Sequence, residues 1–173
     1  MTLLVGEKRG GYVSHPSKRS VILLSIIALA MLAPIGGTVS GQVNSYTYIA
    51  PLANRGYFSI VKYVLDNAKV SIHAALMYIT DPSSSADIQA LCDALINAKN
   101  RGVDVKVVLE SDYQSTSQAA YDYLISAGVN VIWDTGKFIH AKMLVIDGQT
   151  VILGSTNWSN YAQNYNNEVS VLM

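Results

Sequence analysis

Between residues 46 and 172, short runs of apolar β-forming residues alternate with stretches of helical periodicity, and this alternation strongly restricts the fold. The predicted helices are 57–68, 88–101 and 119–127. The predicted strands are 46–49, 70–79, 103–110, 129–133, 141–147, 150–154 and 168–172. Strands that alternate with helices and end in a closing set of strands indicate an α/β sandwich, with helices flanking a mixed β-sheet.

Two local patterns refine this prediction. The Asp147-Gly148 pair between two apolar runs is typical of a tight β-hairpin turn. The polar stretch 160–167, NYAQNYNN, is interpreted as a loop. Cys92 is the only cysteine, so the chain has no internal disulfide and no cysteine-based zinc site, and its apolar neighbours predict a buried helical position.

The N-terminal part carries the pattern of an export segment. Lys18 and Arg19 precede an apolar run over 21–33, and small residues follow, which is typical of a signal peptide. The run is shorter than the roughly 20 residues of a spanning helix, but extension to residue 37 gives a marginal anchor. We therefore expect residues 1–41 to be a signal peptide or membrane anchor and 45–173 to be the catalytic domain.

The positive charges before the apolar run predict that the following domain lies outside the cytoplasm. The location is then the periplasm, the extracellular space or the outer face of the cell membrane, with membrane attachment through 21–37 if the segment is not cleaved. Residues 1–44 carry a net charge of +3, and 45–173 carry −3. A domain that binds nucleic acid strongly usually has a basic face, so the charge balance gives nucleic-acid binding no general support.

The segment 138–160, FIHAKMLVIDGQTVILGSTNWSN, holds polar residues that a strand does not need. If 141–147 is a strand, His140 and Lys142 project to the same side about 7 Å apart, and Asp147 faces the other way. A hairpin would return Ser155 and Asn157 to the same end of the sheet as His140. An imidazole, an ammonium, a hydroxyl and an amide at one place suit a tetrahedral phosphate oxyanion.

This pattern, H-x-K-x4-D-x6-G-S-x-N, resembles the signature of the phospholipase D superfamily, and it is matched without a gap by His140, Lys142, Asp147, Gly154, Ser155 and Asn157. The resemblance extends from about residue 46 to residue 172, through NAKVSIHAALMYIT, ALINAKNRGVDVKVVLE and NNEVSVL. These stretches look like the short, single-motif members of the superfamily, which include an exported bacterial endonuclease.

The resemblance implies a role for each catalytic position. His140 would attack phosphorus and form a phosphohistidine intermediate. Lys142 and Asn157 would hold the non-bridging oxygens, with Ser155 assisting. Glu168 matches the acidic residue that hydrogen-bonds the imidazole and fixes its orientation.

The remaining residues are expected to act outside the chemistry. Asp147 and Gly154 are expected to be structural, and His73 is expected to lie in the sheet outside the site. Superfamily members with two motifs pair them, so a chain with one motif is expected to form a homodimer, in which His140 of the second subunit is the general acid. The sequence has no metal-binding pattern near the motif, and neither a metal nor another cofactor is expected.

The resulting prediction is a metal-independent phosphodiesterase that acts through a phosphohistidine intermediate. More specifically, we expect an exported endonuclease with nucleic acid as its substrate. Two alternatives remain open. One is a phospholipase D or phosphatidyltransferase that acts on lipid headgroups, and the other is a non-catalytic binding protein on the same fold.

Overall fold

The computed structural model describes residues 48–173. The predicted export segment, residues 1–41, lies outside this part of the chain, as do residues 42–47. None of the helices within residues 48–173 has the length and apolar character that crossing a bilayer requires.

Within residues 48–173, seven strands form one mixed sheet in the order β1-β7-β6-β5-β2-β3-β4. Their bounds are β1 Ala50–Ala53, β2 Ser71–Leu76, β3 Asp104–Glu110, β4 Asn130–Asp134, β5 Lys142–Ile146, β6 Thr150–Gly154 and β7 Val169–Leu172. The pairs β2–β3 and β3–β4 are parallel, and all other neighbouring pairs are antiparallel. The predicted α/β fold with a mixed sheet is therefore confirmed.

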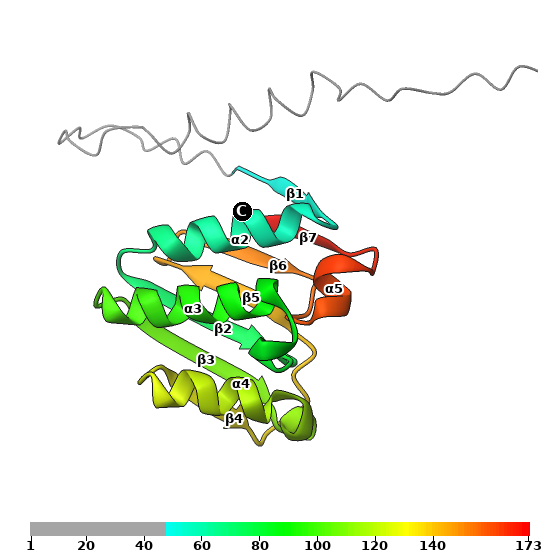
Figure 1. Ribbon diagram of the computed structural model, residues 1–173. Coiled ribbons are helices and arrows are strands. Elements are labelled where there is room, and N and C mark those ends of the chain that lie inside the picture. The colour runs from blue at the N-terminus through cyan, green and yellow to red at the C-terminus, as the bar shows by residue number, and fades with distance from the viewer. Residues whose placement is uncertain (1–47) are drawn as a thin grey trace, which may run out of the picture. The chain divides into compact units, whose positions relative to one another are not determined.

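Three long helices cover one face of this sheet (Figure 1). The helices are α2 Gly56–Asn67, α3 Ala86–Asn100, α4 Gln114–Ser126 and the short α5 Asn160–Asn164, with single 3₁₀ turns at η1 Pro82–Ser84 and η2 Ser111–Tyr113. Gly102 and Gly128 follow α3 and α4 with φ of 90° and 79°, a conformation in which a helix can end and which glycine adopts without strain.

Alternation along the strands separates the two faces of the sheet. Ile72, Val107 and Leu144 point toward the helices and are buried in the core. On the opposite face, His73 is exposed and Met143 is only partly buried. Among residues 48–173, no helix covers this second face (Figure 1).

The β5–β6 hairpin forms as the Asp147-Gly148 pair predicted. The loop spans the three residues 147–149, because Ile146 pairs with Thr150. Gln149 N–H donates to the Ile146 carbonyl at 3.0 Å, and Asp147 and Gly148 have φ of 55° and 65°, a left-handed conformation that Gly and Asp adopt more readily than most residues. Asp147 N–H also donates to the Ser71 carbonyl at 2.8 Å, which ties the turn to the start of β2.

Two local predictions were wrong. Residues 48 and 49 of the predicted strand 46–49 are not in a strand, and the first strand of the described residues lies at Ala50–Ala53 and contains Pro51. Proline is tolerated there because β1 is the edge strand of the sheet. One side of an edge strand pairs with no other strand, so a residue without an N–H on that side loses no hydrogen bond. The predicted loop 160–167 contains α5, which is stabilised because the Ser159 hydroxyl accepts a hydrogen bond from Ala162 N–H at 3.2 Å.

Candidate active site

His140 and Lys142 lie where the β4–β5 loop enters β5. His140 is exposed just before the strand, and Lys142 opens the strand with only 7% of its surface exposed. The Lys142 ammonium donates to the His140 carbonyl oxygen at 2.8 Å and lies 3.3 Å from the sulfur of Met77. Burial lowers the pKa of Lys142, and the negative charge of Glu168 acts in the opposite direction.

Ser155 and Glu168 meet across the neighbouring strands β6 and β7. The Ser155 hydroxyl donates to Glu168 Oε2 and accepts from Val169 N–H at 3.1 Å. The other carboxylate oxygen, Oε1, accepts from the Asn166 amide at 3.0 Å. Within residues 48–173 the hydrogen bonds of this carboxylate go to Ser155 and Asn166, so the predicted contact with His140 stays a prediction.

Asn157 lies in the loop that leaves β6, and this loop is fixed to the core. The Trp158 indole next to it is fully buried and donates to the Tyr57 hydroxyl at 3.2 Å. The Asn157 carbonyl accepts from the Gln163 side chain at 3.0 Å. Its side-chain oxygen is buried with no hydrogen-bond partner among the described residues. The loop therefore holds an amide group with unused hydrogen-bonding capacity near the end of β6.

Gly154 is required by the close approach of β7. A Cβ at this position would lie 2.3 Å from Ser170 Oγ and 2.4 Å from Ser170 Cα, closer than real Cβ contacts. The absence of a side chain thus lets β6 and β7 pair at the point where Ser155 and Glu168 follow.

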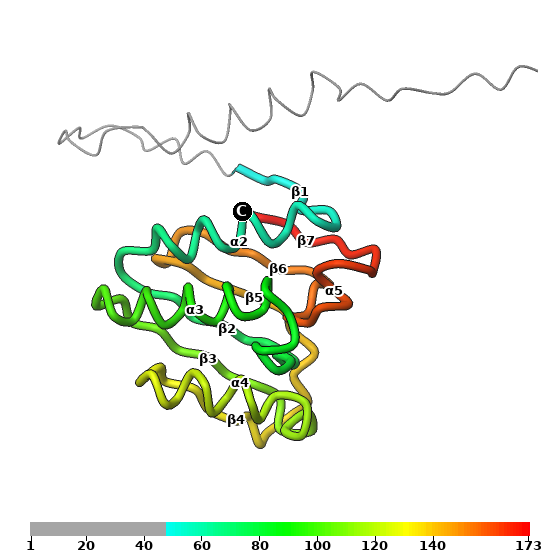
Figure 2. Tube along the Cα trace, in the orientation of Figure 1, coloured from blue at the N-terminus to red at the C-terminus, as the bar shows by residue number. Residues whose placement is uncertain are grey.

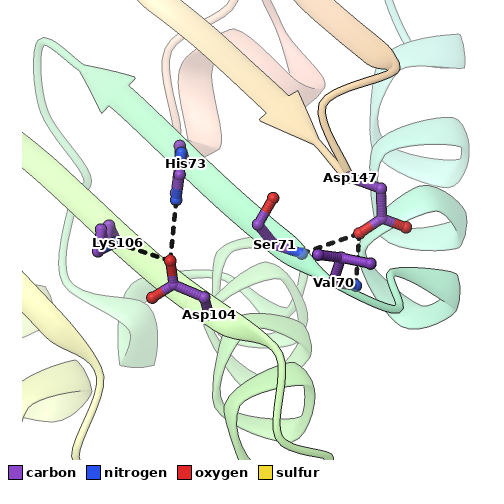
Figure 3. Close-up of polar contacts among 6 residues, drawn as sticks. All are labelled: Val70, Ser71, His73, Asp104, Lys106 and Asp147. Carbon is purple, nitrogen blue, oxygen red and sulfur yellow. Dashed lines mark hydrogen bonds and ion pairs between the residues drawn. The ribbon is translucent and has the colours of Figure 1, made fainter.

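Asp147 lies at the opposite end of β5 from His140. Its carboxylate accepts N–H groups of Val70 at 2.7 Å, Ser71 at 2.9 Å and Lys69 at 2.9 Å, and Figure 3 shows the first two bonds. Partial burial alone would raise the pKa of Asp147, but the hydrogen bonds from Ser71, Val70 and Lys69 outweigh it and lower the pKa. Asp147 joins the hairpin turn to β2 and lies away from the other motif side chains.

His73 lies on the uncovered face of the sheet, away from Lys142. Its Nε2 is 3.2 Å from Asp104 Oδ2, which also accepts from the Lys106 ammonium at 2.7 Å (Figure 3). A pocket of about 320 Å³ opens beside His73 and Lys106 on this face. Across residues 48–173, no three His, Cys, Asp or Glu side chains come close enough together to hold a metal ion.

Glu110 is a site-forming residue that the sequence did not single out. It ends β3, is only 3% exposed, and accepts N–H groups of Asp112 at 3.0 Å and of Ile139. The hydrogen bonds from Asp112 and Ile139 lower the pKa of Glu110. Because Ile139 precedes His140, this carboxylate fixes the β4–β5 loop at the edge where β3 ends, and the loop can be followed in Figure 2.

The arrangement places groups of complementary chemistry at one end of the sheet. His140 offers an exposed imidazole, Lys142 a buried cation, and Ser155 and Asn157 neutral hydrogen-bonding groups. An imidazole can attack a phosphorus atom, and a cation with nearby donors can stabilise the charge that then develops on its oxygens. These groups come from the β4–β5 loop, the start of β5 and the loop after β6.

Comparison with known proteins agrees with this geometry. The family model for a cardiolipin synthase, phospholipase D-like domain matches residues 61–173. The chain is 33% identical over 112 residues to the mitochondrial cardiolipin hydrolase of Xenopus tropicalis, covering 64% of this chain and 50% of that protein. It is 35% identical over 86 residues to the minor cardiolipin synthase ClsB of Bacillus subtilis, covering 47% of this chain and 22% of that protein.

The fold comparison leads to the same family. The phospholipase D family member Nuc from Salmonella typhimurium superimposes with a TM-score of 0.63 at 29% identity, covering 72% of this chain and 82% of that one. The chain spans half or less of the length of the two curated relatives named above. The match to more than half of this chain, together with the shared fold and the complete H-x-K-x4-D-x6-G-S-x-N pattern, shows that the chain belongs to the phospholipase D superfamily.

Proposed function

We propose that this protein is a phosphodiester hydrolase with His140 as its nucleophile and nucleic acid as its substrate. The observation that carries the proposal is that His140 and Lys142 at the start of β5 lie at the same end of the sheet as Ser155 and Asn157 after β6, in a chain of this superfamily. The single-motif members that the sequence resembles include an exported bacterial endonuclease, and this favours nucleic acid over other diesters.

The reaction would run in two displacements. The His140 imidazole attacks phosphorus, the P–N bond forms, and the leaving-group oxygen departs with a proton from a general acid. A water then attacks the phosphohistidine, which releases the phosphate product and restores the imidazole. Lys142, Asn157 and Ser155 would hold the non-bridging oxygens in both steps. The chemistry needs no metal ion.

The general acid would come from a second copy of the chain. Of the two histidines within residues 48–173, His73 lies on the uncovered face of the sheet and pairs with Asp104. A symmetric homodimer that joins the two sites would supply His140 of the second subunit as the acid.

The site of action is proposed to be outside the cytoplasm. Residues 1–41 would direct export, and the apolar run 21–33 would either be removed with the signal peptide or hold the protein to the membrane.

Lipid hydrolysis is a second candidate because two relatives of this chain are named as a cardiolipin hydrolase and a cardiolipin synthase. Attachment through the N-terminal run would place the site beside lipid headgroups. Its reaction would use the same residues, so substrate tests must decide between the two diesters.

The test compares plasmid DNA, bis(p-nitrophenyl) phosphate and a cardiolipin dispersion, each in excess EDTA, with wild type, His140→Ala and Lys142→Ala. We expect DNA and the small diester to be cut by the wild type only. His140→Ala should abolish turnover, and Lys142→Ala should lower kcat at least about a hundredfold, as expected for the loss of a group that stabilises the transition state.

Each contrary result has its own meaning. Activity retained by His140→Ala would overturn the phosphohistidine mechanism. A strict need for added divalent ion would contradict a metal-independent reaction. Turnover of cardiolipin alone would establish the lipid candidate, and no turnover of any substrate by a verified dimer would favour a non-catalytic binding protein.

A further inference from the structure

Three aromatic side chains that the proposed reaction does not use lie where the parallel strands end. Tyr78 follows β2, Tyr113 closes the η2 turn after β3, and Phe138 lies in the loop between β4 and β5. Because the carboxyl ends of parallel strands meet at one edge of a sheet, the topology brings the three rings together. Ligands of open α/β sheets bind at this edge.

The rings form a continuous row that ends at the candidate nucleophile. Tyr78 and Tyr113 stack with centroids 5.3 Å apart and planes 22° apart. Tyr113 and Phe138 are 6.2 Å apart and tilted by 56°. Phe138 and the His140 imidazole are again 6.2 Å apart, with planes only 22° apart. These spacings are those of interacting aromatic pairs.

Phe138 carries the accessible surface of this row. The residue is 51% exposed, whereas Tyr78 and Tyr113 are half-buried. The backbone next to the ring is fixed, because the N–H of Ile139 donates to the buried Glu110 carboxylate, and the ring itself lies against Tyr113 and His140. An exposed ring in a fixed position can bind a planar group without a large loss of conformational entropy.

We propose that Phe138, supported by Tyr113 and Tyr78, is a stacking platform for an unpaired nucleobase next to the diester cleaved at His140. The substrate class is therefore single-stranded nucleic acid. This inference rests on the proposed nuclease function and specifies its substrate. Every base has a face that can stack on an aromatic ring, but in a duplex these faces are covered by neighbouring base pairs.

The charge of the domain supports stacking as the source of affinity. Residues 45–173 carry a net charge of −3, so the domain has no overall excess of basic residues for contacts with phosphates. Lys137, next to Phe138 in the chain, is exposed, and the buried Lys142 follows His140, so a basic residue precedes and another follows the platform in the sequence. Two local cations and a row of rings match the combination by which proteins bind single strands.

A lipid chain fits this surface less well. Asp112 precedes Tyr113 and Lys137 precedes Phe138, and both charged residues are exposed. Insertion of Phe138 into a bilayer would carry these charges toward the hydrocarbon region, at a cost in free energy. A nucleic acid in water imposes no such cost.

The test distinguishes contacts with the nucleobases from contacts with the sugar–phosphate backbone of the substrate. The full-length protein in mild detergent is given a fluorescent oligothymidylate, a chain of the same length with abasic sugars, and a duplex. We expect the KM of the wild type to be on the order of tenfold higher for the abasic chain than for oligothymidylate, as the loss of one stacked base predicts. The duplex should be the poorest substrate.

Variants assign this difference to the platform. Phe138→Ala should bring the ratio of the two KM values close to one, and Phe138→Trp should preserve it. Tyr63→Ala removes a ring on α2 that is 45% exposed and outside the row, and it should keep the wild-type ratio. Fluorescence anisotropy measures the binding of oligothymidylate to the inactive variant His140→Asn and to the double variant His140→Asn/Phe138→Ala. The double variant should bind about tenfold more weakly than His140→Asn alone.

The two proposals can fail separately. Cleavage of oligothymidylate with a wild-type ratio near one, or a ratio that Phe138→Ala leaves unchanged, would overturn the platform and leave the nuclease intact. Binding that depends on Phe138 without any cleavage would support the platform and overturn the nuclease. If Phe138→Ala weakens only the binding or hydrolysis of cardiolipin vesicles, the surface is a lipid contact and the platform is overturned.

Discussion

At the scale of single residues, the H-x-K-x4-D spacing corresponds to the length of one strand, β5. His140 and Lys142 lie where the chain enters β5, and Asp147 lies where it leaves. The Asp147 carboxylate accepts hydrogen bonds from three backbone N–H groups at and just before the start of β2. These bonds fix one end of β5, and the other end of β5 carries His140 and Lys142. One part of the motif provides the chemistry, and the other part stabilises the strand that positions it.

The lowered pKa of Asp147 makes its contribution to stability depend on pH. The unfolded-state pKa is about 3.9, and the folded-state value lies below it. The contribution is therefore complete above the unfolded-state value and is lost as the pH falls through the folded-state value. Asp147→Asn should lower the free energy of unfolding by about 1 kcal/mol at neutral pH, and the difference should shrink as the pH falls below the unfolded-state pKa of about 3.9.

Urea unfolding of both proteins at neutral pH and near pH 2.5 would measure this difference. Asp122→Asn, which changes an exposed carboxylate on α4, is the matched control and should shift the free energy by less than about 0.5 kcal/mol. An equal loss for Asp147→Asn at both pH values would mean that the charge of the carboxylate contributes nothing.

At the scale of elements, the pairing of β6 with β7 depends on the missing side chain of Gly154. Gly154→Ala would place a methyl group against the backbone of β7, so the strands must separate. We expect a loss of about 2 kcal/mol in the free energy of unfolding and a larger loss of activity, because Ser155 and Glu168 follow this contact. Gly56→Ala has open space around it and should cost nothing at the first residue of α2. Thermal and urea unfolding would check both; Gly154→Ala as stable as Gly56→Ala would contradict the close approach.

The sequence predicted most elements because apolar periodicity and glycine positions report local structure directly. It predicted β6 at 150–154 and the hairpin at Asp147, both of which are confirmed. It misplaced β1, because Pro51 argues against a strand unless the strand is known to be at the edge. It missed α5, because a five-residue helix is stabilised by its cap and by buried Ala162 and has no periodicity of its own.

The active-site residues show the same limit. His140 and Lys142 were predictable because they lie two residues apart, within a pattern that has a fixed spacing. Glu110 and Ile139 are 29 residues apart in the chain, and nothing in either local sequence indicates their hydrogen bond. The aromatic row likewise joins residues from three separate loops. Contacts of this kind follow from the order of the strands, which local patterns do not determine.

At the scale of the whole molecule, the proposed reaction needs two imidazoles, and the described part of the chain brings one to the site. If each catalytic centre contains His140 from both subunits, a dimer with one His140→Ala subunit should be inactive. When wild type is mixed with an equal amount of His140→Ala and subunits exchange, activity should fall to about a quarter of the unmixed value at the same total protein concentration. A centre complete within one chain would leave about a half.

His73→Ala in place of His140→Ala is the control and should leave activity unchanged, since that imidazole pairs with Asp104 on the uncovered face. A linear decline with the His140→Ala fraction would show that one subunit suffices and would end the proposal of a shared site.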